Sequence, residues 1–257
     1  MKKFILYIKI ALGTLVAAFI IVVLSILYPQ NLFAHHQRYK SFTIYSKQKQ
    51  VIKTTVLDNA TELVKGSELY DSSYHYDIFL TEKHFIRSLY STVLGPTLAQ
   101  SIDNNIMLHV SVDFNNNLLY NPYNKRNLTE TIAHEMVHCL QLNKYGMFTF
   151  NPINGPQTWI AEGYAEYIAA GEERSDPNYD FKVEAGKLIK AIDENQDWYF
   201  KTPGYGDPII YFKGRILVEY LVTFKHQSFD NILHQDLNED SVFTDLKEWS
   251  IRNPPVY

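Results

Sequence analysis

Two segments decide the fold of this chain: His134-Glu135-Met136-Val137-His138 and, further along, Trp159-Ile160-Ala161-Glu162-Gly163-Tyr164-Ala165-Glu166-Tyr167. Residues four apart on a helix project from one face, so His134 and His138 would point at a common ion. Glu135 would flank that ion without binding it, which is where a general base for metal-activated water belongs. The two segments therefore predict a pair of helices that carries a catalytic zinc site.

The second segment supplies the rest of the predicted site. A catalytic zinc ion takes three protein ligands and keeps an open position for water, and we expect Glu162 to be the third ligand beside His134 and His138. Gly163 would permit close approach of this helix to the first. Glu166 lies one turn further along and is expected to accept a hydrogen bond from the unligated nitrogen of a histidine. The predicted cofactor is one Zn²⁺ per chain.

These segments resemble the gluzincin zinc metallopeptidases, the superfamily of thermolysin and the zinc aminopeptidases, whose second motif reads W-x-x-E-G-x-A-x-Y. The resemblance covers about residues 127–222 and implies the same three ligands, with Glu135 as general base and acid. A further segment, Ile210-Tyr211-Phe212-Lys213-Gly214, is similar to the part of the aminopeptidases in which a tyrosine donates a hydrogen bond to the oxyanion. By that resemblance Tyr211 is a catalytic residue. The chain has no G-x-M-E-N segment, which holds the free amine of an aminopeptidase substrate, so endopeptidase or other acyl-hydrolase activity stays open.

The composition is that of a globular protein with one large domain or two small ones. Of 257 residues, 46% are hydrophobic and 20% are charged. The net charge of −4 and the lack of a basic stripe give no reason to expect a nucleic-acid partner. Cys139 is the single cysteine, so the sequence allows no intrachain disulfide and no cysteine-rich structural zinc site.

The N-terminus predicts a membrane anchor. The nineteen residues from Ile10 to Tyr28 carry no charge, and as a helix they rise about 28 Å, close to the thickness of the hydrocarbon core of a bilayer. Leu32-Phe33-Ala34 is a poor cleavage site, so we expect a single-pass anchor that is not cleaved, with cleavage and secretion as the open alternative. Lysines before the stretch favour a cytoplasmic N-terminus, although basic residues also follow it. The catalytic domain is therefore expected outside the cytoplasm.

The expected fold class is α+β: an N-terminal transmembrane helix, then a mixed strand and helix lobe with an edge strand over a mainly helical zincin-like lobe. We expect an anchor at residues 1–28, a polar stalk at 29–50 and a gluzincin-like catalytic domain at 51–257. Apolar periodicity and turn residues predict, in order, helix Val51–Lys65, strand Tyr74–Leu80, a short helix through Leu89, strand Ile106–Phe114, the motif helix from its cap Asn127 to Gly146, a loop Phe148–Pro156, helix Gln157–Ala170, helix Phe181–Glu194, a loop Thr202–Pro208, and helices Tyr211–Lys225 and Val242–Trp249. The strand Ile106–Phe114 is expected at the edge of the cleft, where an extended peptide would pair with it.

The favoured function is a membrane-anchored, zinc-dependent peptidase that hydrolyses bonds of a peptide or protein substrate. Two alternatives stay open: a zinc-binding assembly or binding module without turnover, and a zinc amidohydrolase that acts on a cell-wall peptide. Glu135 argues against the first alternative, because a structural site has no use for a base beside the metal. The other histidines have no partner visible in the sequence and are expected to be ordinary: His35, His36, His75, His84, His109, His226 and His234.

Overall fold

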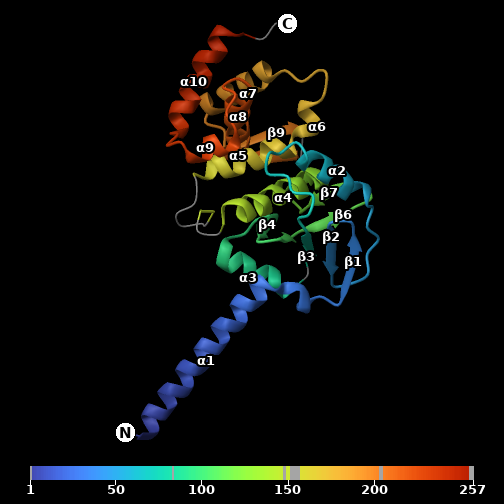
Figure 1. The fold of residues 1–257 in the computed structure, drawn as a ribbon, viewed down its shortest axis with the longest axis vertical. Helices are drawn as coiled ribbons and strands as arrows, with labels where there is room; N and C mark the ends of the chain where they lie inside the picture. Colours follow the sequence, from blue (N-terminus) through green and yellow to red (C-terminus); the bar gives the residue numbers. More distant parts are fainter. Residues whose placement is uncertain (1, 83, 147–148, 151–156, 203–204, 255–257) are drawn as a thin grey trace. The chain divides into compact units, whose positions relative to one another are not determined.

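The computed structural model describes the chain except residues 1, 83, 147–148, 151–156, 203–204 and 255–257 (Figure 1). Helices and strands both occur along the chain, which confirms the α+β class. The described residues form two compact units: unit 1 comprises residues 1–50 and 75–110, and unit 2 comprises residues 51–74 and 111–257. Residues 75–110 thus group with the N-terminal segment instead of joining a single domain at 51–257, because their first strand pairs with the strand at 42–46.

Unit 1 is built on a five-stranded sheet in the order β1-β2-β3-β5-β4. The three middle strands run parallel, and the two edge strands pair antiparallel with their neighbours. The elements of this unit are α1 (Lys2–Leu27), the 3-10 helix η1 (Pro29–Leu32), β1 (His35–Tyr39), β2 (Phe42–Ser46), β3 (Tyr76–Leu80), α3 (Phe85–Leu94), β4 (Ala99–Ile102) and β5 (Asn105–Leu108).

The helix α1 confirms the expectation of an N-terminal helix of membrane-spanning length. Its residues Lys9–Leu27 have a mean hydropathy of 2.9, and 6% of this stretch is buried in the structure. By length and composition the helix is able to cross a membrane.

Residues 29–50 were expected to be a polar stalk, and that expectation is wrong. They form η1 and the hairpin β1–β2, and Phe42 and Ile44 are buried because β2 lies inside the sheet, between β1 and β3. The strand β1, with the sequence His-His-Gln-Arg-Tyr, is an exposed edge strand. Charged and polar side chains are common on edge strands, so a polar segment does not exclude sheet structure.

The strand expected over Ile106–Phe114 is two strands that belong to different units. The strand β5 pairs with β3 on one side and with β4 on the other, so it is not an edge strand. The strand β6 (Ser111–Asp113) lies at an edge of the sheet in unit 2. The prediction of one long edge strand is therefore wrong, because the apolar alternation continues through both short strands and does not reveal the break at His109 and Val110.

Unit 2 is mainly helical, and α4 is its central helix. Most residues of α4 from Leu128 to Gln141 are buried, and the helix packs against α2 and α5. The helix α5 packs in turn against α8. The elements of this unit are α2 (Thr55–Val64), the antiparallel sheet β6-β7-β8 with β7 (Leu118–Tyr120) and β8 (Lys125–Asn127), α4 (Leu128–Tyr145), α5 (Thr158–Ala169), α6 (Gly171–Arg174), α7 (Phe181–Asp193), the hairpin β9 (Trp198–Thr202) and β10 (Tyr205–Pro208), α8 (Ile209–Thr223), α9 (Phe229–His234) and α10 (Glu239–Arg252).

The ends of α4 follow from its capping residues, as the sequence predicts. The side chain of Asn127 accepts a hydrogen bond from the backbone amide of Glu130 at 3.2 Å. Gly146 ends the helix with φ of 78°, a conformation that favours glycine. The other predicted helices of unit 2 are also found, with ends shifted by a few residues. The loop expected at residues 148–156 lies mostly outside the described residues.

In the segment expected as a loop at Thr202–Pro208, Thr202 belongs to β9 and Tyr205–Pro208 form β10, while residues 203 and 204 lie outside the described residues. Gly206 lies opposite Phe200, at the irregularity in the register of the two strands. A Cβ atom at Gly206 would lie 2.5 Å from the ring of Phe200, so the strand needs glycine there for this ring to lie across it. Glycine and proline predict a loop when read locally, but here they accommodate a packed ring and the end of a strand.

The helices α5 and α8 cross at two glycines. A Cβ atom at Gly163 would lie 2.4 Å from the carbonyl oxygen of Gly214, and one at Gly214 would lie 3.0 Å from the carbonyl oxygen of Trp159. Gly163 was expected to let its helix approach the motif helix α4, but the close approach that it permits is to α8. The two backbones touch at this crossing, and Tyr211 lies one turn before it on α8.

Candidate metal centre

His134 and His138 lie on α4, and their Nε2 atoms point toward each other. Their Nε2 atoms are 3.0 Å apart, and the ring planes meet at 80° with centroids 4.6 Å apart. The spacing of four residues places both rings on one side of the helix, as the motif predicts. Both histidines are shielded from solvent, because α4 is the central helix of unit 2.

Glu162 of α5 brings a carboxylate oxygen to the same point. Its Oε2 atom lies 3.2 Å from Nε2 of His134 and 3.3 Å from Nε2 of His138. Ligands at 2.0–2.1 Å from a tetrahedral zinc ion are about 3.3 Å from one another. The three edges of 3.0, 3.2 and 3.3 Å therefore have nearly the size that such an ion requires.

Gln141 fixes the tautomer of His138. The amide nitrogen of Gln141 donates to the carbonyl of Ala161 at 3.1 Å, so its amide oxygen faces Nδ1 of His138 at 2.8 Å. That oxygen only accepts, so Nδ1 carries a proton and Nε2 of His138 is the nitrogen that faces His134 and Glu162. A histidine that binds a metal needs this arrangement.

Glu166, Arg126 and Asp207 form a chain of charges behind His134. Oε1 of Glu166 lies 3.2 Å from Nδ1 of His134, an ion-pair contact that is poorly directed for a hydrogen bond. Arg126 of β8 donates a hydrogen bond to Glu166 at 3.0 Å and forms an ion pair with Asp207 of β10 at 2.6 Å. Arg126 thus joins three elements around the histidine. Glu166 lies beside the nitrogen that faces away from Glu162 and His138, but the expected hydrogen bond from this nitrogen is not formed.

The charges of this cluster favour a cation at its centre. Burial disfavours a charged histidine, but Glu166 and Glu162 overcome it and raise the pKa of His134 well above its ordinary value. The pKa of His138 is also raised against burial, chiefly by Glu162. Burial would raise the pKa of Glu162, but His138 and His134 hold it well below its ordinary range. A proton or a metal ion between these groups satisfies the same electrostatic demand.

Glu135 and Tyr211 act electrostatically on the three candidate ligands or are influenced by them. Glu135 is buried and follows His134 on α4, and its charge adds to that of Glu162 in raising the pKa of His138. The ring of Tyr211 lies 6.4 Å from the ring of His134, centroid to centroid. Burial and then Glu162 raise the pKa of Tyr211 to about 12, so the phenol keeps its proton at neutral pH and is able to donate it in a hydrogen bond.

A cavity of about 280 Å³ adjoins the cluster. Its walls include Arg126, His134, Glu166 and Tyr211, so it lies on the side of His134 that carries Nδ1. Further lining comes from Tyr199 of β9 and from the residues at the end of β10. The hairpin β9–β10, which sequence reasoning missed, therefore forms one wall of the space next to the candidate centre.

The donor set fits a metal ion. Two imidazole nitrogens and one carboxylate oxygen, from His134, His138 and Glu162, lie close enough to one another to bind a single cation. With both Nε2 atoms deprotonated, three electron-rich atoms would face one another without a positive charge between them, which is unfavourable in a buried site. Imidazole with carboxylate is a ligand set that zinc accepts.

Comparisons with known proteins do not add to this assignment. No protein-family model matches the chain, and no curated protein matches it significantly. The assignment of the centre therefore stands on its geometry and on the motifs.

Sequence reasoning missed three residues that orient the centre. Gln141 lies three residues after His138 on the same helix, and this spacing was a usable signal. Arg126 and Asp207 gave no signal, because their contact joins strands that are distant in the sequence. Of the remaining histidines, none joins this cluster within the part of the chain that the structure describes.

Proposed function

We propose that unit 2 is a zinc-dependent peptidase of the gluzincin type, which hydrolyses bonds in a peptide or protein substrate. One observation carries the proposal. The two Nε2 atoms and the Glu162 oxygen form a triangle with edges of 3.0 to 3.3 Å, the size expected around tetrahedral zinc. Three protein ligands leave a position open, which is the arrangement of a catalytic site.

Zinc bound by these ligands would supply a Lewis acid that polarises a carbonyl group and acidifies water. Glu135 would accept the proton of the attacking water and deliver it to the leaving amine. Tyr211 would donate its hydrogen bond to the oxygen of the substrate carbonyl as negative charge develops there. Its raised pKa supports this role, because the hydroxyl stays protonated.

We also propose that α1 anchors the chain in a membrane and that unit 2 lies outside the cytoplasm. The mean hydropathy of 2.9 over Lys9–Leu27 supports the anchor, and the lysines that precede this stretch support the orientation. The substrate would then be a protein or peptide on that side of the membrane.

The first test is the metal content of the detergent-solubilised chain, with Glu162→Ala and Glu135→Gln measured beside the wild type. We expect one zinc per chain in the wild type and in Glu135→Gln, and weakened retention in Glu162→Ala. A library of peptides then tests turnover, which Glu135→Gln should abolish. Absence of zinc from wild type purified without chelators would contradict the centre. Zinc binding without cleavage of any peptide or cell-wall fragment would favour a binding module.

A further inference from the structure

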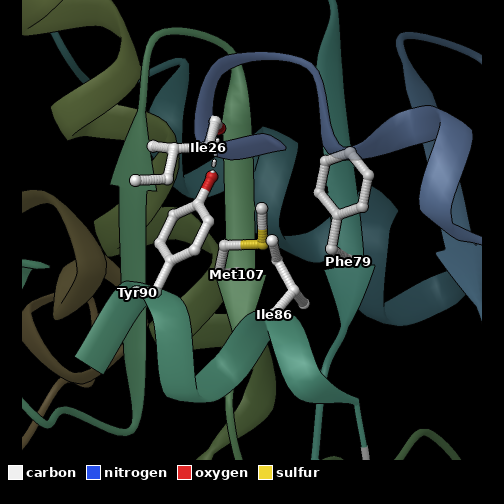
Figure 2. Packing of buried hydrophobic residues seen from close by; sticks show 5 residues of the cluster. All are labelled: Ile26, Phe79, Ile86, Tyr90 and Met107. Atoms are coloured by element: carbon white, nitrogen blue, oxygen red, sulfur yellow. Dashed lines mark hydrogen bonds between the residues drawn. The ribbon is translucent and has the colours of Figure 1, made fainter. Parts of the chain in front are cut away.

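The last turns of α1 are part of the core of unit 1. Ile26 is 8% exposed and packs in a cluster with Phe79, Ile86, Tyr90 and Met107. Figure 2 shows these side chains converging from the end of α1, from α3 and from the neighbouring strands of the sheet. The apolar helix therefore does not lead into a free linker. Its last residues are packed in the core of unit 1.

Side chains of the same unit satisfy carbonyl groups at the end of α1. A helix leaves its last four carbonyl groups without partners inside the helix. The Tyr90 hydroxyl donates to the carbonyl of Ile26 at 2.5 Å (Figure 2), and the Asn105 amide donates to the carbonyl of Leu27 at 3.1 Å. Tyr90 and Asn105 are both fully buried. Without α1 these polar groups would lose their partners, which is unfavourable for a buried group.

Side-chain contacts also attach the segment that follows α1 to the rest of unit 1. The amide of Gln30 donates to the carboxylate of Asp77 at 3.0 Å. The ring of Phe33 stacks on His84, with centroids 4.5 Å apart, and lies 5.2 Å from the ring of Phe79. This segment is the one in which a signal peptidase would have to cut.

A cut after Ala34 would take Ile26, Gln30 and Phe33 away from unit 1. The loss would open a cavity among apolar side chains and leave buried polar groups unpaired, both of which destabilise a folded unit. A signal peptide that is cleaved off is not expected to form part of the core of the domain that remains. The packing therefore argues for retention of α1.

The stretch of α1 from Ile10 to Ile21 exposes apolar surface on all sides of the helix. All residues from Ile10 to Ile21 are exposed, and none of them is charged. An apolar surface of this extent is unusual on a soluble protein. The charge-free stretch Ile10–Tyr28 rises about 28 Å as a helix, which matches the hydrocarbon core of a bilayer. The occupant of this surface is therefore lipid.

We propose that α1 is a permanent element of unit 1 and that unit 1 lies directly against the lipid surface, without a stalk between them. Ile26 packs against α3 before the apolar stretch ends at Tyr28, so no polar segment separates the exposed part of α1 from unit 1. Phe85, which precedes Ile86 on α3, is 63% exposed, and aromatic side chains gather at the membrane interface. This proposal rests on the membrane anchoring proposed for α1 and is independent of the peptidase function proposed for unit 2.

Retention is tested on the full chain with a C-terminal tag, extracted from the membrane fraction. We expect an intact mass that includes α1 and resistance of the protein to extraction at alkaline pH. A soluble chain that begins near residue 35 would overturn the proposal.

The packing of the end of α1 in the core of unit 1 is tested with two substitutions on this helix in the detergent-solubilised full chain. Ile26→Ala should lower the midpoint of thermal unfolding by roughly 5–10 °C, because it opens a cavity in the cluster. Leu24→Ala is the matched control, because Leu24 is 49% exposed, and it should leave the midpoint unchanged. Equal midpoints of thermal unfolding for the two variants would show that the end of α1 is not packed in the core of unit 1.

Contact with lipid is tested with environment-sensitive labels at Tyr28→Cys or Phe85→Cys, each in a Cys139→Ala background. The labelled chains are placed in phosphatidylcholine nanodiscs with and without nitroxide-labelled headgroups. Both labels should be quenched by the nitroxide, and Tyr28 at the helix exit is the positive control. Quenching at Tyr28 without quenching at Phe85 would overturn the direct contact of unit 1 with the lipid surface.

Discussion

The histidine His109 in unit 1 and the pair His134 and His138 in unit 2 are all shielded from solvent, yet their chemistry is opposite. Burial, with Arg87 in addition, lowers the pKa of His109 to about 4. Carboxylates overcome the same burial at the pair and raise both pKa values. Burial therefore does not distinguish a core histidine from a candidate ligand, whereas the neighbouring groups do.

The hydrogen bonds of the rings show the same contrast. At His109 the hydroxyl of Thr81 lies 2.8 Å from Nδ1 and the amide oxygen of Gln100 lies 3.2 Å from Nε2, so both nitrogens are engaged. At His138 a glutamine oxygen engages Nδ1, and Nε2 faces Nε2 of His134 at 3.0 Å and the carboxylate of Glu162 at 3.3 Å. A histidine nitrogen that faces a carboxylate and a second imidazole, with the other nitrogen held by an acceptor, is prepared for a cation.

The largest effect is expected when one of the two histidines of the pair is replaced. His138→Ala should weaken zinc retention by more than about a hundredfold, because loss of a ligand exceeds the effect of losing a residue that only orients one. His109→Ala should leave zinc retention unchanged, because His109 has no free nitrogen. The measurement is competition with a chelating dye on both purified variants. Equal zinc affinity in the two variants would remove the distinction between the histidines.

The second prediction concerns pH and the stability of unit 1. The pKa of His109 is about 4 in the fold and about 6.5 when unfolded, so the unfolded chain binds the extra proton first. The stability that comes from keeping His109 neutral is complete above about pH 6.5 and is lost as the pH falls toward 4. The loss amounts to roughly 3 kcal/mol for this single group. Hydrogen exchange of the β5 amides at pH 7 and pH 4.5 measures it.

The control for this prediction is His109→Gln, which cannot take up a proton at this position. Other groups titrate in both proteins, so the quantity of interest is the difference between wild type and variant. The wild type should lose more protection on acidification than the variant does. Parallel losses in the two proteins would show that His109 is not held neutral by the fold.

How much of the site the sequence reveals depends on how local each contact is. The pair on α4 follows from helical spacing, and Glu162 follows from a second helix with carboxylates. Arg126 reaches Glu166 and Asp207 only after strands distant in the sequence come together. Local periodicity carries no information about such contacts, so they could not be predicted.

The same rule separates the helices of the fold from its strands. The cap Asn127 and the end Gly146 predict α4 because capping is local. The position of β2 inside the sheet and the pairing of β5 with β3 depend on partners that are distant in the sequence, so the expected stalk and the expected edge strand are both wrong. Gly163 was recognised as a point of close approach, but the identity of the approaching helix required the tertiary structure.

A third prediction compares the two glutamines that contact these histidines, Gln141 at His138 and Gln100 at His109. Gln141→Leu removes the acceptor that fixes the tautomer of His138, and zinc affinity should fall by about ten- to a hundredfold. Gln100→Leu removes the corresponding acceptor from His109 and should leave zinc affinity unchanged. Both affinities are measured by dye competition. A similar loss in both variants, or in neither, would contradict the role of Gln141.

The smallest expected effect separates the stability of α4 from the chemistry that it carries. Asn127 caps α4 and Asn238 caps α10, each through its side-chain oxygen, so the two residues form a matched pair. Each change to Ala should lower the free energy of unfolding by about 1 kcal/mol. The loss should be larger at Asn127, because this side chain also accepts a hydrogen bond from Asn117 at 3.0 Å.

Zinc affinity provides the second measurement on this pair. The cap lies two turns before His134. The contacts that orient the candidate ligands, that of His138 with Gln141 and that of His134 with Glu166, do not involve Asn127. Asn127→Ala should therefore reduce stability to denaturant and leave zinc affinity at the wild-type level, as Asn238→Ala does. If zinc affinity fell with Asn127→Ala alone, the start of α4 would be part of what holds the two Nε2 atoms 3.0 Å apart. The contrast between the histidines would then rest on the position of the helix as well as on the groups around each ring.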